Sequence, residues 1–243
     1  MSNVRMYAFF GLFLATTPAT AGEIAMTELG ESAQTLSAGE LLLHPLFYAS
    51  SYGITDDLQV NLSILEYLGQ PNVALEYNLT DNETLAISVN TFFSTDWATE
   101  YNTVGSGGTL TIKLDEDNLN FSVGKERIHQ RTDFDVEPYG SPVIPLAISY
   151  DHRLDEATVL HFGVESDGFQ IANKRTPMIL SAHWAHSINN VRLRLGVDAV
   201  AGVHPLSTLS PVMAATAAET GAAGALPDWP VVPLPHLEMW FSF

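Results

Sequence analysis

The stretch Val191-Arg-Leu-Arg-Leu-Gly-Val-Asp198 alternates strictly between apolar and other residues. Successive side chains on a β-strand point to opposite faces, so this stretch predicts a strand with one apolar and one polar face. The same period of two recurs in residues 58–64, 72–79, 85–90, 109–114, 119–124, 160–165 and 237–243. The chain is therefore predicted to be all-β, with antiparallel strands that each carry one apolar face.

The lengths of the connections favour a membrane barrel over a water-soluble sandwich, the other fold in which strands with one apolar face occur. Short turns are expected at 55–57, 80–83, 115–118, 151–156 and 187–190. These short turns alternate along the chain with longer connections at 67–71, 94–106, 129–142, 166–177 and 203–234. This order is typical of a transmembrane β-barrel with short periplasmic turns and longer external loops. We expect about 12 strands, the first within 35–45; ten or fourteen would also fit.

The composition excludes several classes of protein. Of the 243 residues, 46% are apolar and only 16% are charged, and 28 acids against 10 bases give a net charge of −18. That balance excludes a nucleic-acid-binding protein that works by neutralising phosphates. The absence of Cys excludes disulfide scaffolds, iron–sulfur clusters and thiol catalysis. No cofactor is expected.

The N-terminal residues have the parts of an export signal. Arg5 precedes an apolar run over 6–15, and Ala19-Thr-Ala21 follows as a small-x-small cleavage site. We therefore expect a signal peptide over 1–21. Residues 22–34 are predicted to be a periplasmic lead, with a small plug as the alternative, and 35–243 to be the barrel domain, in which 203–234 forms a long loop.

The C-terminus, Leu237-Glu-Met-Trp-Phe-Ser-Phe243, carries a resemblance to a known class. Its alternating apolar residues and terminal aromatic resemble the assembly signal of Gram-negative outer-membrane β-barrel proteins. Tyr52-Gly-Ile-Thr-Asp56 is similar to the Tyr-Gly-Leu-Thr-Asp turns of small barrels of this class, and it recurs as Tyr77-Asn-Leu-Thr-Asp81. The resemblance implies a place in the bacterial outer membrane, contact with its lipid, and recognition of Leu237, Met239, Phe241 and Phe243 by the barrel-assembly machinery.

The polar rows of the strands would line the lumen of such a barrel. Carrying the alternation along the chain predicts these lumen-lining residues: Glu76, Lys113, His161, Glu165, His183, Arg192, Arg194, Asp198 and Glu238. We expect Arg192 and Arg194 to pair with the acids of this set. The aromatic residues expected at the membrane interfaces are Phe92, Phe93, Trp97, Trp184 and Trp240.

Among functions, the pattern favours a passive pore for small solutes or ions. The alternatives are a closed structural barrel that presents external loops and a lipid-modifying hydrolase. A Ser149–His161 pair across a hairpin would be the candidate for hydrolysis. No stretch resembles the motifs of known barrel hydrolases, so an enzyme is not expected.

No metal site is predicted either. His183 and His186 are three residues apart and would point to opposite faces of a strand. The acidic turn Asp115-Glu-Asp-Asn118 is not a complete calcium-binding loop.

Overall fold

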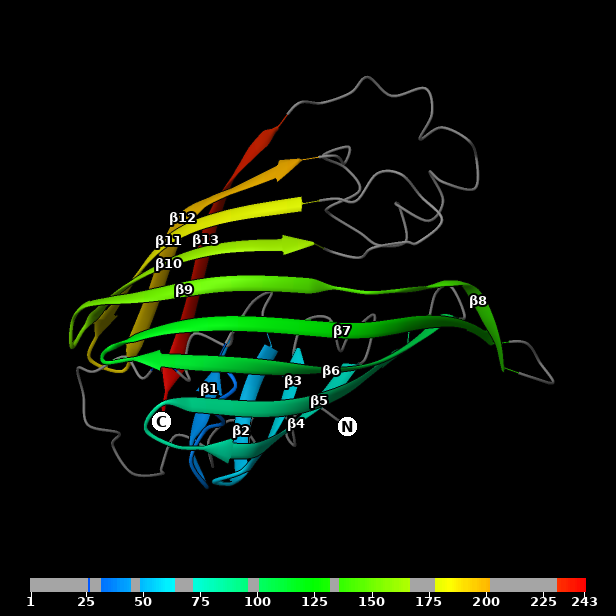
Figure 1. Cartoon of the computed structure of the whole chain (residues 1–243), viewed down its shortest axis with the longest axis horizontal. Coiled ribbons are helices and arrows are strands. Elements are labelled where there is room, and N and C mark those ends of the chain that lie inside the picture. Colours follow the sequence, from blue (N-terminus) through cyan, green and yellow to red (C-terminus); the bar gives the residue numbers. More distant parts are fainter. Residues whose placement is uncertain are drawn as a thin grey trace, which may run out of the picture.

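The chain forms a closed antiparallel β-barrel in the computed structural model (Figure 1). The structure describes residues 26, 32–44, 49–63, 72–95, 101–131, 136–166, 178–201 and 231–243, so the expected signal peptide and Trp97 lie outside the described residues. The strands are β1 (Leu41–Leu43), β2 (Ala49–Thr55), β3 (Leu58–Ser63), β4 (Asn72–Asp81), β5 (Leu85–Thr95), β6 (Tyr101–Leu114), β7 (Asp117–Arg131), β8 (Val136–Val143), β9 (Leu146–Asp155), β10 (Thr158–Ser166), β11 (Met178–Ile188), β12 (Val191–Ala201) and β13 (Val232–Ser242). Among these residues, no helix has the length and apolarity that crossing a membrane would require.

Twelve positions around the barrel are filled by these thirteen strands. Strands that are neighbours in the chain pair with each other, except β8 and β9, and β1 pairs with β13 to close the ring. β8 and β9 share one position, because both pair with β7, at its two ends. Pro145 lies between them and has no N–H to donate to a ladder. The predicted number of 12 strands is confirmed.

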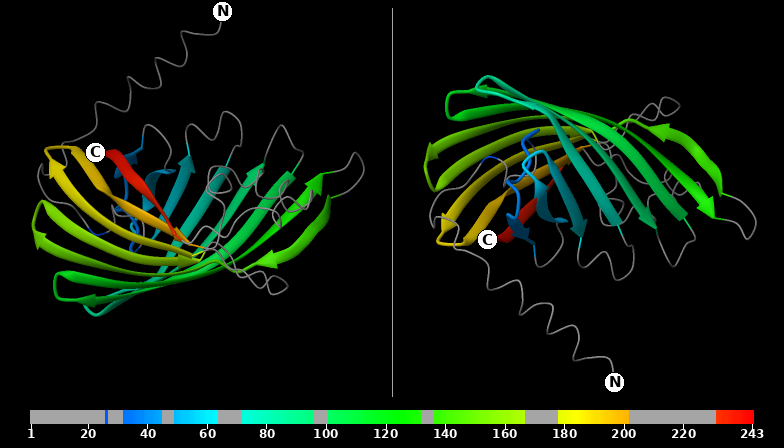
Figure 2. Two further views of the ribbon diagram at one scale, coloured as in Figure 1. Left: turned by 90° about the horizontal axis from the view of Figure 1, so that it is seen from above. Right: turned by 90° about the horizontal axis from the view of Figure 1, so that it is seen from below.

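The side chains of the barrel are arranged with apolar residues outside and polar residues inside. In β12, Leu195 and Val197 are 43% and 48% exposed, whereas Arg192 and Arg194 are 2% and 5% exposed. The other strands repeat this order, so large exposed apolar side chains occur around the whole outer surface. The strands curve round a common interior in Figure 2. The sandwich alternative is therefore wrong, since a sandwich buries its apolar faces.

Short turns gather at one end of the barrel, here called the short-turn end. Two-residue connections join β6 to β7 and β11 to β12, and each begins with a residue of positive φ, Asp115 and Asn189. Asp and Asn tolerate this conformation better than most residues do. The predicted turn at 151–156 is wrong, because β9 continues to Asp155. Asp151 is fully buried on the inner wall rather than solvated in a turn.

The predicted long connections at 94–106 and 129–142 are also too long. β5 extends to Thr95 and β6 begins at Tyr101, while β7 and β8 take up most of the second range. Gly105, a residue type that favours loops, lies in β6 because it makes room for a neighbouring side chain. A Cβ there would lie 2.0 Å from the ring of Phe92, so glycine lets that ring lie against β6. The predicted loop 203–234 likewise ends earlier, since β13 begins at Val232.

Residues 32–37 lie inside the short-turn end, so residues 32–34 fit the small-plug alternative for 22–34 rather than a periplasmic lead; residues 22–25 and 27–31 lie outside the described residues. The N–H of Ala33 donates to Thr111 Oγ1 at 2.7 Å, and the N–H of Leu36 donates to Gln59 Oε1 at 2.9 Å. Leu36 packs in an apolar cluster with Leu42, Val159, Ala185 and Trp240. The backbone passes so close to Gly53 that a Cβ there would lie 2.1 Å from the carbonyl oxygen of Ser37. This inward segment, residues 32–37, therefore narrows the barrel at the short-turn end.

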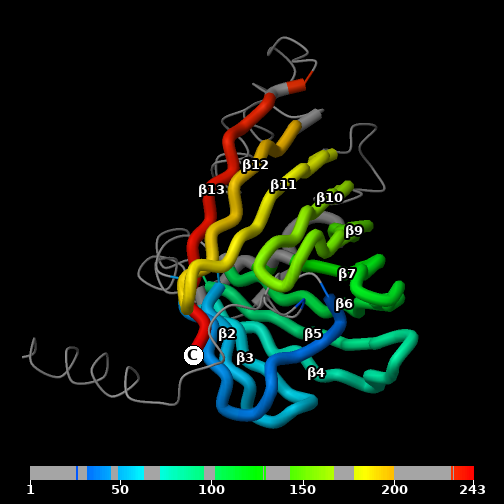
Figure 3. The backbone as a smooth tube through the Cα atoms, turned by 90° about the vertical axis from the view of Figure 1, so that its left-hand side faces the viewer, coloured from blue at the N-terminus to red at the C-terminus, as the bar shows by residue number. Residues whose placement is uncertain are grey.

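The ring closes where the two ends of the sheet meet. β1 is three residues long and pairs with β13 through Leu42–Ser242 and Leu43–Phe241. The N–H groups of Leu41 and Phe243 donate to each other's carbonyl groups at 2.9 Å. Figure 3 shows the end of β13 beside the first strands of the chain.

Candidate functional site

A continuous polar cluster lines the inner wall across β9 to β13 and β1. It begins at Asp151, whose carboxylate lies 2.7 Å from Nδ1 of His161. The ring of His161 stacks on that of His183 at 5.3 Å, and His183 stacks on His236 at 3.9 Å. Asp198 contacts both of these last rings, at 2.8 Å from Nε2 of His183 and 2.9 Å from Nδ1 of His236.

The cluster continues towards the short-turn end through Glu238. This carboxylate lies 3.6 Å from Nε2 of His236, 3.1 Å from Nδ1 of His44 and 3.2 Å from the Arg194 guanidinium. Trp240 is fully buried beneath it, stacked on His44 at 5.6 Å and covered by Arg194 at 5.7 Å. Trp240 is therefore an interior residue, and its assignment to a membrane interface is wrong. Side chains fill this part of the barrel.

Two glycines make room for the histidines. A Cβ on Gly163 would lie 2.4 Å from Ser181 Oγ and 3.0 Å from Nε2 of His161. A Cβ on Gly196 would lie 2.4 Å from Cδ2 of His183. Gly196 pairs with His183 on one side and His236 on the other, so the two rings meet over a position without a side chain.

An acidic cavity of about 390 Å³ occupies the opposite wall, where β3 to β7, β9 and β10 meet. Glu76, Glu126 and Glu165 line it together with small and polar residues, and no basic residue lines it among the described part of the chain. Ser88 donates to one Glu76 oxygen at 2.7 Å, and Gln59 donates to the other at 3.4 Å. Such a cavity attracts cations, because three carboxylates line the same space.

The residues predicted to line the lumen fall into three groups. Glu76 and Glu165 line the acidic cavity. Lys113 pairs with Asp81 near the short-turn end, and Arg192 donates to the carbonyl group of Asn189. His161, His183, Arg194, Asp198 and Glu238 belong to the polar cluster. The expected pairing is thus present between Arg194 and Glu238.

The sequence analysis did not predict four residues of these sites: His44, Glu126, Asp151 and His236. Glu126 and His236 lie on the same polar rows as Ser122 and Glu238, so longer strands would have included them. The charged run after Tyr150 indicated a turn at Asp151. His44 follows the three-residue strand β1, which is too short for its period to be recognised.

For the candidate Ser149–His161 pair, the structure shows other partners of both residues. Ser149 accepts a hydrogen bond from Asn120 at 3.1 Å, and Ser181 Oγ lies 3.4 Å from Nε2 of His161. Asp151, His161 and Ser181 have the order of a hydrolytic triad. However, β11, which carries Ser181, is paired with β10 on one side and with β12 on the other. Its backbone N–H groups are therefore used in the sheet and cannot stabilise an oxyanion.

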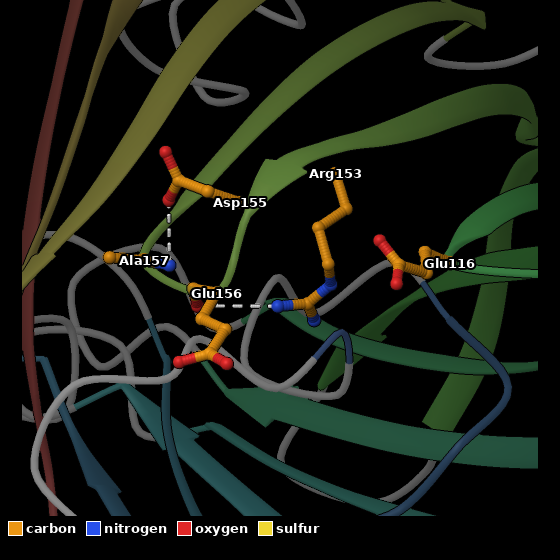
Figure 4. A pocket seen from close by; sticks show the side chains of 5 residues that line it. All are labelled: Glu116, Arg153, Asp155, Glu156 and Ala157. Atoms are coloured by element: carbon orange, nitrogen blue, oxygen red, sulfur yellow. Dashed lines mark hydrogen bonds between the residues drawn. The ribbon is translucent and has the colours of Figure 1, made fainter.

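A separate hollow lies among the turns at the short-turn end (Figure 4). The Arg153 guanidinium donates to the carbonyl group of Glu156 at 3.2 Å, and the N–H of Ala157 donates to the Asp155 carboxylate at 2.9 Å. Both bonds stabilise the β9–β10 hairpin. The side chains do not converge on a common point, so this hollow is not a candidate site.

Comparison of the chain with protein-family models finds no match, and comparison with curated proteins and with solved structures finds no significant similarity.

Proposed function

We propose that the chain is an outer-membrane β-barrel that acts as a passive, cation-preferring channel of low conductance. The acidic cavity inside a barrel with an apolar outer surface is the observation that carries this proposal. An apolar outer surface needs lipid rather than water around it, and a closed sheet leaves no unpaired edge in hydrocarbon.

The preference for cations rests on where the charges lie. Glu76, Glu126 and Glu165 line the cavity, and no basic residue of the described part of the chain lines it. Arg194, which lies elsewhere in the interior, pairs with Glu238. A permeant cation entering the barrel therefore meets a net negative wall, and an anion is repelled.

The low conductance rests on the filling of the barrel. The inward segment and the packed cluster around Trp240 occupy the half near the short turns. The path left for ions at that end is therefore narrow, which predicts a low conductance.

Single-channel recording of the refolded protein in a planar bilayer tests the proposal. We expect small steps, and a reversal potential that indicates a preference for K⁺ over Cl⁻ in a KCl gradient. A folded, inserted barrel that conducts no ions would refute the channel. It would favour the second candidate, a closed barrel with external loops. The filled interior around Trp240 supports that candidate.

A further inference from the structure

His183, Asp198 and His236 bring two imidazoles and one carboxylate to a single point on the inner wall. Their ligand atoms all lie within 4.8 Å of one another. The three residues come from the neighbouring strands β11, β12 and β13, so the ladders of a rigid sheet fix their positions. This is the ligand set that divalent first-row transition metals such as Zn²⁺ bind.

The distances allow an ion to replace the hydrogen bonds. Nε2 of His183 lies 2.8 Å from Oδ1 of Asp198, and Nδ1 of His236 lies 2.9 Å from Oδ2. Ligand atoms around a tetrahedral zinc ion are separated by about 3.3 Å, given metal–ligand bonds of about 2.0 Å. Each pair would therefore need to open by about 0.5 Å, and the stacked imidazole rings, with 25° between their planes, would need to turn so that both nitrogens point at one ion. Side-chain torsions can provide both changes.

The surroundings favour a cation at this point. Glu238 lies 3.6 Å from Nε2 of His236, the nitrogen opposite the proposed ligand atom. A carboxylate in that place orients a metal-bound imidazole and makes it a stronger ligand. The positive charge of Arg194 is paired with Glu238 at 3.2 Å. Asp198 supplies the negatively charged ligand for the ion.

The site also has space and access. Gly196 lies between His183 and His236 and leaves the two rings free to face each other, since a Cβ there would strike Cδ2 of His183 at 2.4 Å. The histidine side chains are 4% and 9% exposed, whereas Asp198 is 24% exposed and gives an ion a path from the interior.

From this geometry we infer that His183, Asp198 and His236 form a binding site for one Zn²⁺-like divalent cation inside the barrel. The inference goes beyond the proposed channel and does not depend on it, because binding can be measured on a barrel that does not conduct. It also revises the expectation of no metal site. That expectation considered His186 as the partner of His183, whereas the partner comes from β13.

Calorimetric titration of the folded barrel in detergent micelles with Zn²⁺ alone tests the inference. We expect one Zn²⁺ per chain, and a visible absorption band typical of tetrahedral coordination when Co²⁺ is used instead. His183→Ala, Asp198→Asn and His236→Gln should each weaken binding at least tenfold. Glu238→Gln should weaken it by about 10- to 100-fold without removing a ligand.

His152→Ala is the matched control, since His152 also lies 3.0 Å from an aspartate, Asp117, but has no second histidine there. It should leave the affinity within about twofold, the level at which an uninvolved surface site contributes nothing. Absence of Zn²⁺ binding to the unsubstituted barrel would overturn the inference without any variant. Binding that survives in His183→Ala and His236→Gln, or that is lost in His152→Ala, would do the same.

Discussion

Neutralising the three glutamates of the acidic cavity should remove most of the preference for cations. A sphere with the volume of this cavity, about 390 Å³, has a radius of about 4.5 Å, which puts a central cation about 6 Å from each carboxylate. At that distance one charge contributes about 0.7 kcal/mol in a water-like dielectric. Each of Glu76→Gln, Glu126→Gln and Glu165→Gln should thus lower the permeability of the cation about threefold at low salt. The cation-to-anion permeability ratio should fall at least about threefold, because the anion is also repelled less.

The triple variant should lower the ratio at least about 30-fold at low salt, if the three effects are additive. Screening reduces each effect towards about twofold at 0.1 M salt, where the Debye length is about 10 Å. Reversal potentials in KCl gradients at two ionic strengths measure both quantities. Glu116→Gln is the control, because Glu116 lies in the β6–β7 turn outside the cavity. An unchanged ratio in the triple variant, or an equal change in the control, would refute the reasoning.

Three other predictions concern the inward segment, the rim and the C-terminus. Gly53→Ala should lower the melting temperature and raise the conductance, because its methyl group would collide with the backbone at Ser37, at a cost of about 1–3 kcal/mol; a melting temperature equal to that of the unsubstituted barrel would contradict the close approach. At the β6–β7 turn, burial opposes ionisation of Asp117, but hydrogen bonds from Tyr150, His152 and a backbone N–H outweigh it and lower the Asp117 pKa. The resulting stabilisation is present above the ordinary aspartate pKa of about 3.9 and is lost as the pH falls through the lower folded value. Melting temperatures of the unsubstituted barrel and Asp117→Asn should therefore differ at pH 7 and converge in acid, and a constant difference would exclude the linkage. Deletion of Phe243 should reduce the amount of folded barrel in the outer membrane of a Gram-negative host, measured by heat-modifiable migration in gels; undiminished assembly would argue against the C-terminal signal.

The period of two in the sequence was enough to predict the architecture. The alternation of Leu195 and Val197 with Arg194 and Gly196 shows which residues share a face without any knowledge of the neighbouring strands. Counting the strands gives eleven, and the even number typical of such barrels adds a twelfth. Strand ends were less predictable. Gly105 and Asp151 belong to residue types that favour loops, and only the ring of Phe92 and the imidazole of His161 explain their places in strands.

The candidate sites were less predictable than the strands that carry them. Alternation places His183 and Asp198 on the inner wall, but it does not say which inner residues of neighbouring strands face each other. That depends on register, which sets Gly196 between His183 and His236. The inward segment had no periodic signal at all, because its backbone bonds to side chains such as Gln59 rather than to a neighbouring strand.

The seam between β1 and β13 has a consequence for how the protein is made. Across this seam Leu42 and Leu43 pair with Ser242 and Phe241, at the far end of the sequence, while β2 covers the other side of β1. A chain that stopped before Phe241 could form every other hairpin and still keep an open sheet. The seam therefore works as a check on completeness: a truncated product would expose two unpaired edges there, which invite degradation or aggregation, while the closed seam exposes neither.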